Sequence, residues 1–179
     1  MVTTTAGRAQ GYSATAVLVR GVIGGLIAGA IFIALNMWFS TSTGGPPNGP
    51  LLAISTIVKG DAAMAAGATS VPLGWFVHFV LSALFGLVFA LAAARLGTNG
   101  SLALAGVVYG ALLYVVNFQI LAPLFFKVFT GANQPFELVA HVVFGVVLSL
   151  LLFSSGLRHG EPLISLGSGG SRTARPVSS

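Results

Sequence analysis

One stretch near the middle of the chain restricts the fold more than any other. Residues 74–95 read GWFVHFVLSALFGLVFALAAAR, and from Trp75 to Ala94 only His78 and Ser82 are polar. About 20 such residues are enough to cross a bilayer as a helix. Charged residues make up 6% of the chain, whereas soluble domains carry roughly 25%. The chain is therefore predicted to be an integral membrane protein.

Four apolar stretches predict an all-α fold, a four-helix bundle embedded in the membrane. The expected spans cover about residues 17–39, 74–95, 102–122 and 135–154, within one membrane domain, 17–155. A flexible N-terminus, 1–16, and a disordered Gly/Ser/Arg-rich tail, 156–179, are expected to flank it. Between the first two spans, Pro50–Met64 predicts a short apolar helix that lies on the membrane surface or re-enters it.

The positions of the cations predict the topology. Lys and Arg accumulate on the cytoplasmic side of membrane proteins. Two cations, Lys59 and Lys127, fall on one side of the predicted spans, and the other six fall on the opposite side: Arg8, Arg20, Arg95, Arg158, Arg172 and Arg175. Both termini are therefore expected in the cytoplasm. The chain has no basic stripe with interleaved aromatic residues, so no nucleic-acid partner is expected.

A spacing pattern recurs in the two halves of the chain. The pattern G-x-x-x-G-A-x5-N occurs at Gly25, Gly29, Ala30 and Asn36, and again at Gly106, Gly110, Ala111 and Asn117. Each copy precedes a histidine followed by small residues at every fourth position, at His78 and at His141. Two tandem helical hairpins, forming a parallel repeat, would produce this pattern. The alternative is that two unrelated Gly/Ala-rich helices have converged on similar sequences.

The repeat places polar side chains at similar depth. With a rise of 1.5 Å per residue, Asn36, His78, Asn117 and His141 are expected in one layer within about 10 Å of the outer surface. Glu137 lies one helical turn before His141 and shares its face. Polar groups at membrane depth normally find partners inside a bundle.

Three interpretations of this layer stay open. In the first, each histidine hydrogen-bonds an asparagine on the adjacent helix and locks the packing. In the second, His78 and His141 are axial ligands of a haem b iron, with the porphyrin accommodated by Ser82, Gly86 and Gly145 and its propionates met by Lys59 and Lys127. In the third, the layer is a proton relay, another metal site or a small-ligand site. Two histidines alone are too few ligands for zinc.

Three segments resemble a family of small bacterial membrane proteins: GWFVHFVLSALFG at 74–86, ILAPLF at 120–125 and ELVAHVVFGVVLS at 137–149. That family has four predicted spans, a G-W-x-x-H-F-like second span, an H-x-x-x-G fourth span and no assigned activity. The resemblance extends over about residues 21–153. It implies four spans, with His78 and His141 as motif positions. The expected location is the bacterial inner membrane.

The functional expectation is a non-enzymatic membrane subunit or accessory protein of a larger, for example respiratory, complex. This expectation rests on the glycines that recur at every fourth position and on the lack of a soluble domain. The expected partners are the lipid bilayer and other membrane subunits or further copies of the chain. The alternatives are a bis-histidine haem b electron-transfer protein and a small oligomeric channel or transporter. No Walker-type loop, G-x-S-x-G or H-E-x-x-H motif is present.

Overall fold

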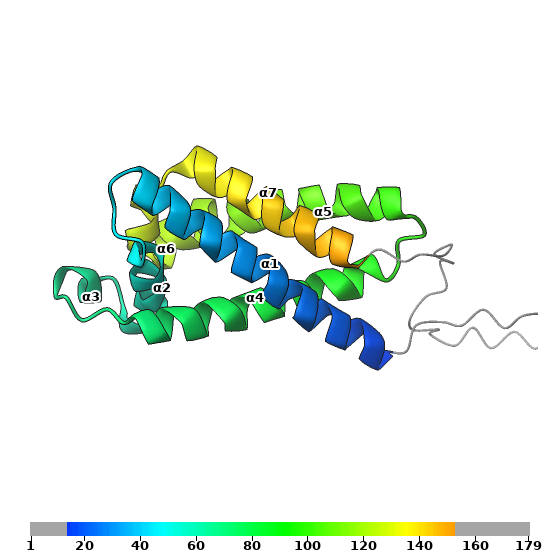
Figure 1. Ribbon diagram of the computed structural model, residues 1–179, viewed down its shortest axis with the longest axis horizontal. Coiled ribbons are helices and arrows are strands. Elements are labelled where there is room, and N and C mark those ends of the chain that lie inside the picture. Colours follow the sequence, from blue (N-terminus) through cyan, green and yellow to red (C-terminus); the bar gives the residue numbers. More distant parts are fainter. Residues whose placement is uncertain (1–13, 153–179) are drawn as a thin grey trace, which may run out of the picture.

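The computed structural model describes residues 14–152 and places four apolar helical segments, each long enough to cross a membrane, in one bundle (Figure 1). The first, second and fourth spans are the helices α1 (Ala14–Ser42), α4 (Val71–Ala93) and α7 (Gln134–Leu151). The third span, Asn99–Phe125, comprises α5 (Asn99–Tyr114), the π-helical segment η1 (Val115–Leu121) and α6 (Ala122–Phe125). No strand occurs among the described residues. The prediction of an all-helical, multi-pass membrane protein is confirmed.

The four spans are not packed evenly around the bundle. Helix α1 packs along both α4 and α7, and α5 packs along α7, whereas α4 and α5 touch only briefly. The start of α1 and the end of α7 lie at one end of the molecule, here called the terminal end (Figure 1). The opposite end, here called the loop end, carries α2, α3 and α6. Helix α1 therefore joins one pair of helices to the other.

The ends of the spans differ from the expected bounds by a few residues. Residues 14–16, expected in the flexible N-terminus, form the first turn of α1, whereas the rest of both predicted tails lies outside the described residues. The starts of α4 and α7 are fixed by side-chain caps. Ser70 accepts a hydrogen bond from the Leu73 amide, and Asn133 accepts one from the Phe136 amide. Each helix also has a proline in its first turn, where no amide donor is needed.

The third span continues past its expected end at residue 122. Pro123 lacks an N–H group and cannot bond the carbonyl four residues earlier. The helix nevertheless extends to Phe125, because the turns just before the proline widen into a π-helix. In this segment the amide of Ala122 reaches the carbonyl of Asn117, five residues back. A π-helix of this kind absorbs the misfit of the proline ring without ending the span.

The short helix expected at Pro50–Met64 is divided in two, α2 (Gly49–Lys59) and α3 (Ala62–Ala65). The break falls at Gly60, whose φ of 81° suits glycine far better than other residues. Helix α2 packs against the start of α4 at the loop end. There the Leu51 carbonyl touches Gly74 so closely that a Cβ at that glycine would overlap it. The buried hydroxyls of Ser55 and Thr56 bond carbonyls of α2 itself.

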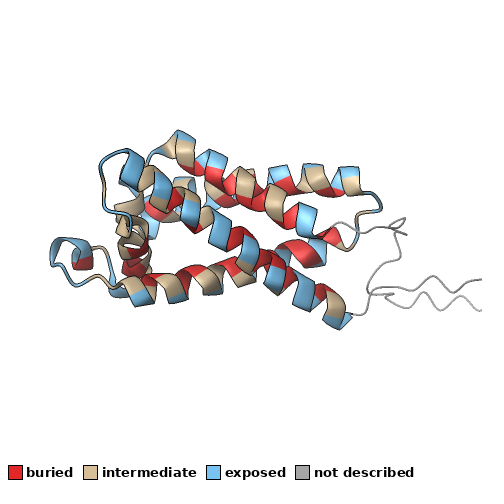
Figure 2. Ribbon diagram, viewed as in Figure 1, coloured by how far each residue is buried: buried red, intermediate tan, exposed pale blue. Residues whose placement is uncertain are grey.

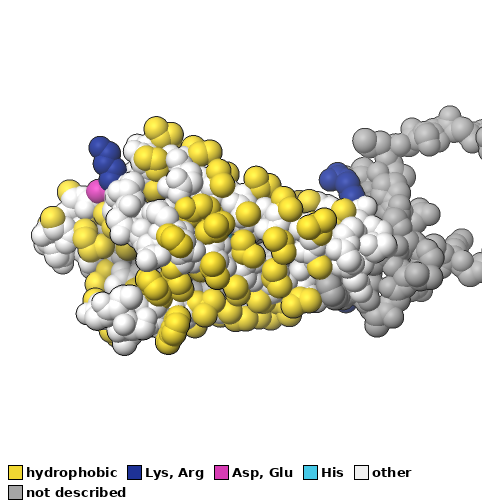
Figure 3. All heavy atoms as spheres, turned by 90° about the horizontal axis from the view of Figure 1, so that it is seen from above, with side chains coloured by type: hydrophobic (Ala, Val, Ile, Leu, Met, Phe, Trp, Pro, Cys, Tyr) yellow, Lys and Arg dark blue, Asp and Glu magenta, His cyan; other side chains and the backbone are white. Residues whose placement is uncertain are grey.

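Glycines set the spacing within each helix pair. A Cβ on Gly86 of α4 would collide with the backbone of Gly25 in α1, and a Cβ on Gly145 of α7 would collide with the backbone of Gly106 in α5. Such contacts allow two membrane helices to approach to backbone distance. Burial follows the inward faces of the bundle (Figure 2). On the face drawn in Figure 3, apolar side chains cover the length of the helices, and the Lys and Arg side chains lie at the two ends.

Candidate functional site

His78 lies on the buried face of α4, two turns from the start of the helix, and bonds α1. Its Nε2 is 2.8 Å from the Gly29 carbonyl oxygen, so this nitrogen carries the proton and donates it. The hydroxyl of Ser82 donates to the backbone carbonyl of His78 and lies 3.5 Å from the same Nε2. The absence of a side chain at Gly29 lets the imidazole reach the backbone of α1. His78 therefore joins the first two spans.

His141 occupies the matching place in α7 but has different partners. Its Nδ1 donates to the carbonyl of Glu137 in the same helix, at 2.7 Å. The Glu137 Oε2 atom is 3.9 Å from that nitrogen, which is too long for a hydrogen bond. Only 7% of Glu137 and 5% of His141 are exposed. Glu137 Oε2 is buried and has no hydrogen-bond partner within the described part of the chain.

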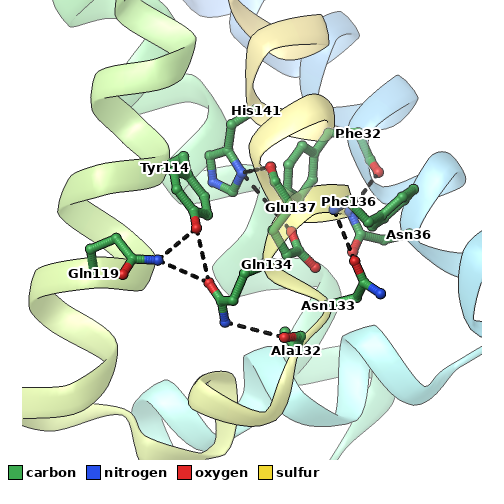
Figure 4. Close-up of polar contacts among 10 residues, drawn as sticks. All are labelled: Phe32, Asn36, Tyr114, Gln119, Ala132, Asn133, Gln134, Phe136, Glu137 and His141. Atoms are coloured by element: carbon green, nitrogen blue, oxygen red, sulfur yellow. Dashed lines mark hydrogen bonds and ion pairs between the residues drawn. The ribbon is translucent and has the colours of Figure 1, made fainter.

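An aromatic side chain of α1 connects the two histidines. The ring of Phe32 stacks on His78 at a centroid distance of 5.9 Å and meets His141 edge-on at 4.8 Å. Asn36, one turn further along α1, is buried, and its amide group donates to the carbonyl of Phe32. Figure 4 shows Phe32, Glu137 and His141 side by side where α1 meets α7. Four of the residues singled out from the sequence thus gather around Phe32: Asn36, His78, Glu137 and His141.

Asn117, the fifth member of the expected layer, does not join this group. It lies in the π-helical segment, half-buried, and its side chain takes part in none of the hydrogen bonds made there by the described residues. The π-helix explains the difference, because it turns the residues after Tyr114 away from the register of a regular helix. Phe118, in the next position, instead presents its ring to His141 at 5.3 Å. Neither histidine bonds an asparagine, so the first interpretation of the layer was wrong about the partners.

A second polar group, which the sequence patterns did not predict, lies beside His141. Gln119 donates to the hydroxyl of Tyr114 and to the side-chain oxygen of Gln134, and the Tyr114 hydroxyl also donates to that oxygen (Figure 4). The Tyr114 ring lies 6.2 Å from the His141 ring. Two glutamines and a tyrosine in or beside apolar spans were a usable signal, because amides at membrane depth seek partners.

The expected haem arrangement does not fit these residues. Phe32 contacts both imidazoles and takes the space that a porphyrin would need between them. Gly86 and Gly145 are filled by the backbones of Gly25 and Gly106, so they leave no free volume beside the histidines. His78 Nε2 already donates to a carbonyl. Each imidazole keeps one ring nitrogen outside the hydrogen bonds of the described residues, Nδ1 of His78 and Nε2 of His141, and Phe32 contacts both rings.

Of the two lysines expected to meet the propionates, Lys59 has a partner in its own loop region, and the backbone amide of Lys127 is held by Asp61. Lys59 donates to the Ala68 carbonyl at 2.6 Å. The carboxylate of Asp61 accepts hydrogen bonds from the backbone amides of Lys127 and Val128, at 2.9 and 3.4 Å. Within residues 14–152 no three His, Asp or Glu side chains lie close enough to hold a metal ion. The described part of the buried site thus has one carboxylate and two imidazoles, each of which uses one ring nitrogen in a hydrogen bond to a backbone carbonyl.

Fold and site together define a class: a four-helix, multi-pass membrane protein with a small buried polar site at the junction of its first and fourth spans. Comparisons add no closer relationship, because the chain matches no known protein family, no curated protein and no solved structure at a significant level.

Proposed function

We propose that this protein is a non-enzymatic, integral subunit of a membrane assembly, that it resides in a bacterial inner membrane, and that its third span forms the contact with a second copy of the chain. The supporting observation is uneven burial. In the most apolar 18 residues of the third span only 22% are buried inside the bundle, against 39% in each of the other three spans. A closed four-helix bundle would bury all four spans to a similar extent.

The exposed side of the third span carries an apolar ridge, as α1 and α4 also do, and unlike theirs it leads to an exposed amide. A ridge of large apolar side chains runs along it at every fourth position, Leu104, Val108 and Leu112, each at least half exposed. Further along the same span, toward the loop end, lies Gln119, an exposed amide. Amide side chains bond across helices in membranes.

A second copy is the partner favoured by this chemistry. An amide contains both a donor and an acceptor, so two Gln119 side chains can pair across the interface when each redirects one of the N–H groups that bond Tyr114 and Gln134 in the single chain. A two-fold axis along the membrane normal places the same residue of both copies at equal depth. The interface then needs no complementary residue from a different protein.

The orientation and the repeat belong to the same proposal. Both termini are assigned to the cytoplasm, because six of the eight Lys and Arg residues in the sequence fall on the side of the termini and only Lys59 and Lys127 fall on the other. The parallel repeat is supported by equivalent glycine contacts. Gly25 meets Ser82 and Gly86, and in the second half Gly106 meets the matching positions Gly145 and Ser149.

Single cysteines test the interface cleanly, because the natural chain has none. Val108→Cys is placed on the ridge, and Ile23→Cys is the matched control on α1. Both residues lie nine positions from the start of their helices and are about half exposed, 50% and 52%. Mild oxidation of native membranes is expected to give a cross-linked pair for Val108→Cys and monomer for Ile23→Cys. Equal cross-linking of both, or of neither, would overturn the interface, and a product with a different protein would replace the second copy by that protein.

A further inference from the structure

The start of α7 holds an unusual group for a membrane span: a carboxylate side chain in the first turn, 93% shielded, with one oxygen that lacks a donor. Burying a charged carboxylate without hydrogen bonds is costly, so such a group is normally paired or neutral. Its neighbour His141 points its donor at the backbone and leaves the second ring nitrogen without a hydrogen bond. The pair therefore has open acceptor positions and nothing in the described chain that fills them.

The first half of the molecule shows what the same position looks like when it is filled. By the spacing of the two histidines, Glu137 corresponds to Gly74, four residues before His78. At Gly74 the backbone of α2 occupies the space directly, through the Leu51 carbonyl. His78 in turn is bonded across to α1. In the described part of the second half, no helix equivalent to α2 fills this position, and the Glu137 carboxylate lies there instead. The two halves therefore differ at this position.

Polar groups link the pair to the loop end. Gln134, in the first turn of α7, joins Tyr114 and the exposed Gln119, and its own amide donates to the Ala132 carbonyl in the loop (Figure 4). The Tyr114 ring then faces His141. Hydroxyl and amide side chains of this kind can bind and orient water. The pair is thus buried but lies only about one helical turn from the surface at the loop end.

We propose that Glu137, supported by His141, is an exchangeable proton-binding site in the outer half of the bundle. Uptake of one proton turns the carboxylate into a neutral carboxylic acid, and release to water at the loop end restores it. No co-reactant is needed. Metal cations fit less well, because zinc takes three or four protein ligands and calcium or magnesium six or more oxygens, whereas one carboxylate and one imidazole are present.

The charges around the pair are few. On α7 itself the titratable neighbour is His141, and from α5 it is Tyr114. Helix α1 contributes Phe32 and Asn36, and the π-helical segment contributes Phe118, none of which titrates in water. The other described ionisable groups of the loop end are Lys59 at the end of α2, Asp61 and Lys127. They bond backbone groups or lie on the surface. A proton on Glu137 therefore has no competing buried acid within residues 14–152.

Infrared spectroscopy of the full chain in lipid vesicles tests the proposal, because the chain has only three acidic residues, Asp61, Glu137 and Glu161. The C=O stretch of a protonated, buried carboxyl is expected to appear as the pH falls and to shift in heavy water. Glu137→Gln is expected to abolish the band, and Asp61→Asn to leave it intact. Circular dichroism verifies that each variant keeps its helix content.

Two matched substitutions test the role of the neighbour. His141→Gln is expected to move the titration midpoint of the band by about one pH unit, as loss of an adjacent ionisable group does. His78→Gln, the equivalent change in the first half, is expected to leave it in place. The proposal is overturned if the band persists in Glu137→Gln, if folded wild-type protein shows no band at any pH, or if the band neither titrates nor shifts in heavy water. Equal effects of the two histidine variants would remove His141 from the site.

Discussion

The backbone contact at Gly86 predicts a large stability loss from a single methyl group. In Gly86→Ala the new Cβ would lie 2.5 Å from the Cα of Gly25 and 2.7 Å from its nitrogen, and closer still to the Gly21 carbonyl oxygen. Carbon atoms in contact prefer about 3.5–4.0 Å, so α1 and α4 must separate by about 1 Å. Overpacking costs about 1–3 kcal/mol. Backbone cannot rotate away as a side chain can, so the upper end, about 3 kcal/mol, is expected.

Two other glycines provide a graded series for the same measurement. A Cβ on Gly24 would lie 3.0 Å from a terminal methyl of Leu148, which can move, so Gly24→Ala is expected to cost at most about 1 kcal/mol. A Cβ on Gly100 would have 3.9 Å to its nearest neighbour, in Thr98. Gly100→Ala is therefore expected to be neutral or slightly stabilising, because alanine favours helix.

Reversible unfolding in mixed micelles, with increasing SDS, measures the three free energies of unfolding by circular dichroism. About 3 kcal/mol corresponds to a loss of roughly two orders of magnitude in the folded-to-unfolded ratio, which moves the midpoint well outside experimental error. The reasoning is refuted if Gly86→Ala unfolds at the wild-type midpoint, or if Gly24→Ala loses as much as Gly86→Ala does.

Two further substitutions test single hydrogen bonds. Tyr109 donates to the Phe85 carbonyl at 2.8 Å and so ties α5 to α4; Tyr109→Phe is expected to lower the free energy of unfolding by about 0.6 kcal/mol, the average for such bonds in a membrane protein, and an unchanged value would argue against the tie. Asp61→Ala removes the acceptor for the Lys127 and Val128 amides; for a net bond of about 1 kcal/mol, hydrogen exchange at these amides is expected to rise about fivefold, whereas wild-type exchange rates would count against the bond.

Hydropathy predicted the spans because lipid imposes its requirement on every residue of a crossing helix. The faces of close helix contact could also be predicted, because glycines at such contacts, for example Gly25 and Gly106, recur at every fourth position of the sequence. Both features depend on regular helix geometry alone. This is why the four helices, and the glycines at their close contacts, could be predicted from the amino-acid sequence.

The partners of the polar side chains could not be predicted from the sequence in the same way. Phe32, which contacts both histidines, is one of many phenylalanines in apolar spans, and its sequence context does not distinguish it from a lipid-facing residue. The π-helical turn before Pro123 shifts the register of Asn117, and no periodicity rule anticipates it. The packing of α2 against Gly74 is a long-range contact that only the folded chain establishes. Register and rotamer at such points are decided by tertiary packing.

The two helix pairs meet mainly along a single seam, between α1 and α7, because α4 and α5 have little in common beyond the Tyr109 contacts. Two helix pairs joined along one contact can separate on the other side with a modest loss of buried surface, and the contact then acts as a hinge. Phe32 and Asn36 lie at this hinge, beside the carboxylate of Glu137. A change of charge at the α1–α7 contact would therefore produce its largest displacement on the opposite side of the bundle, between α4 and α5.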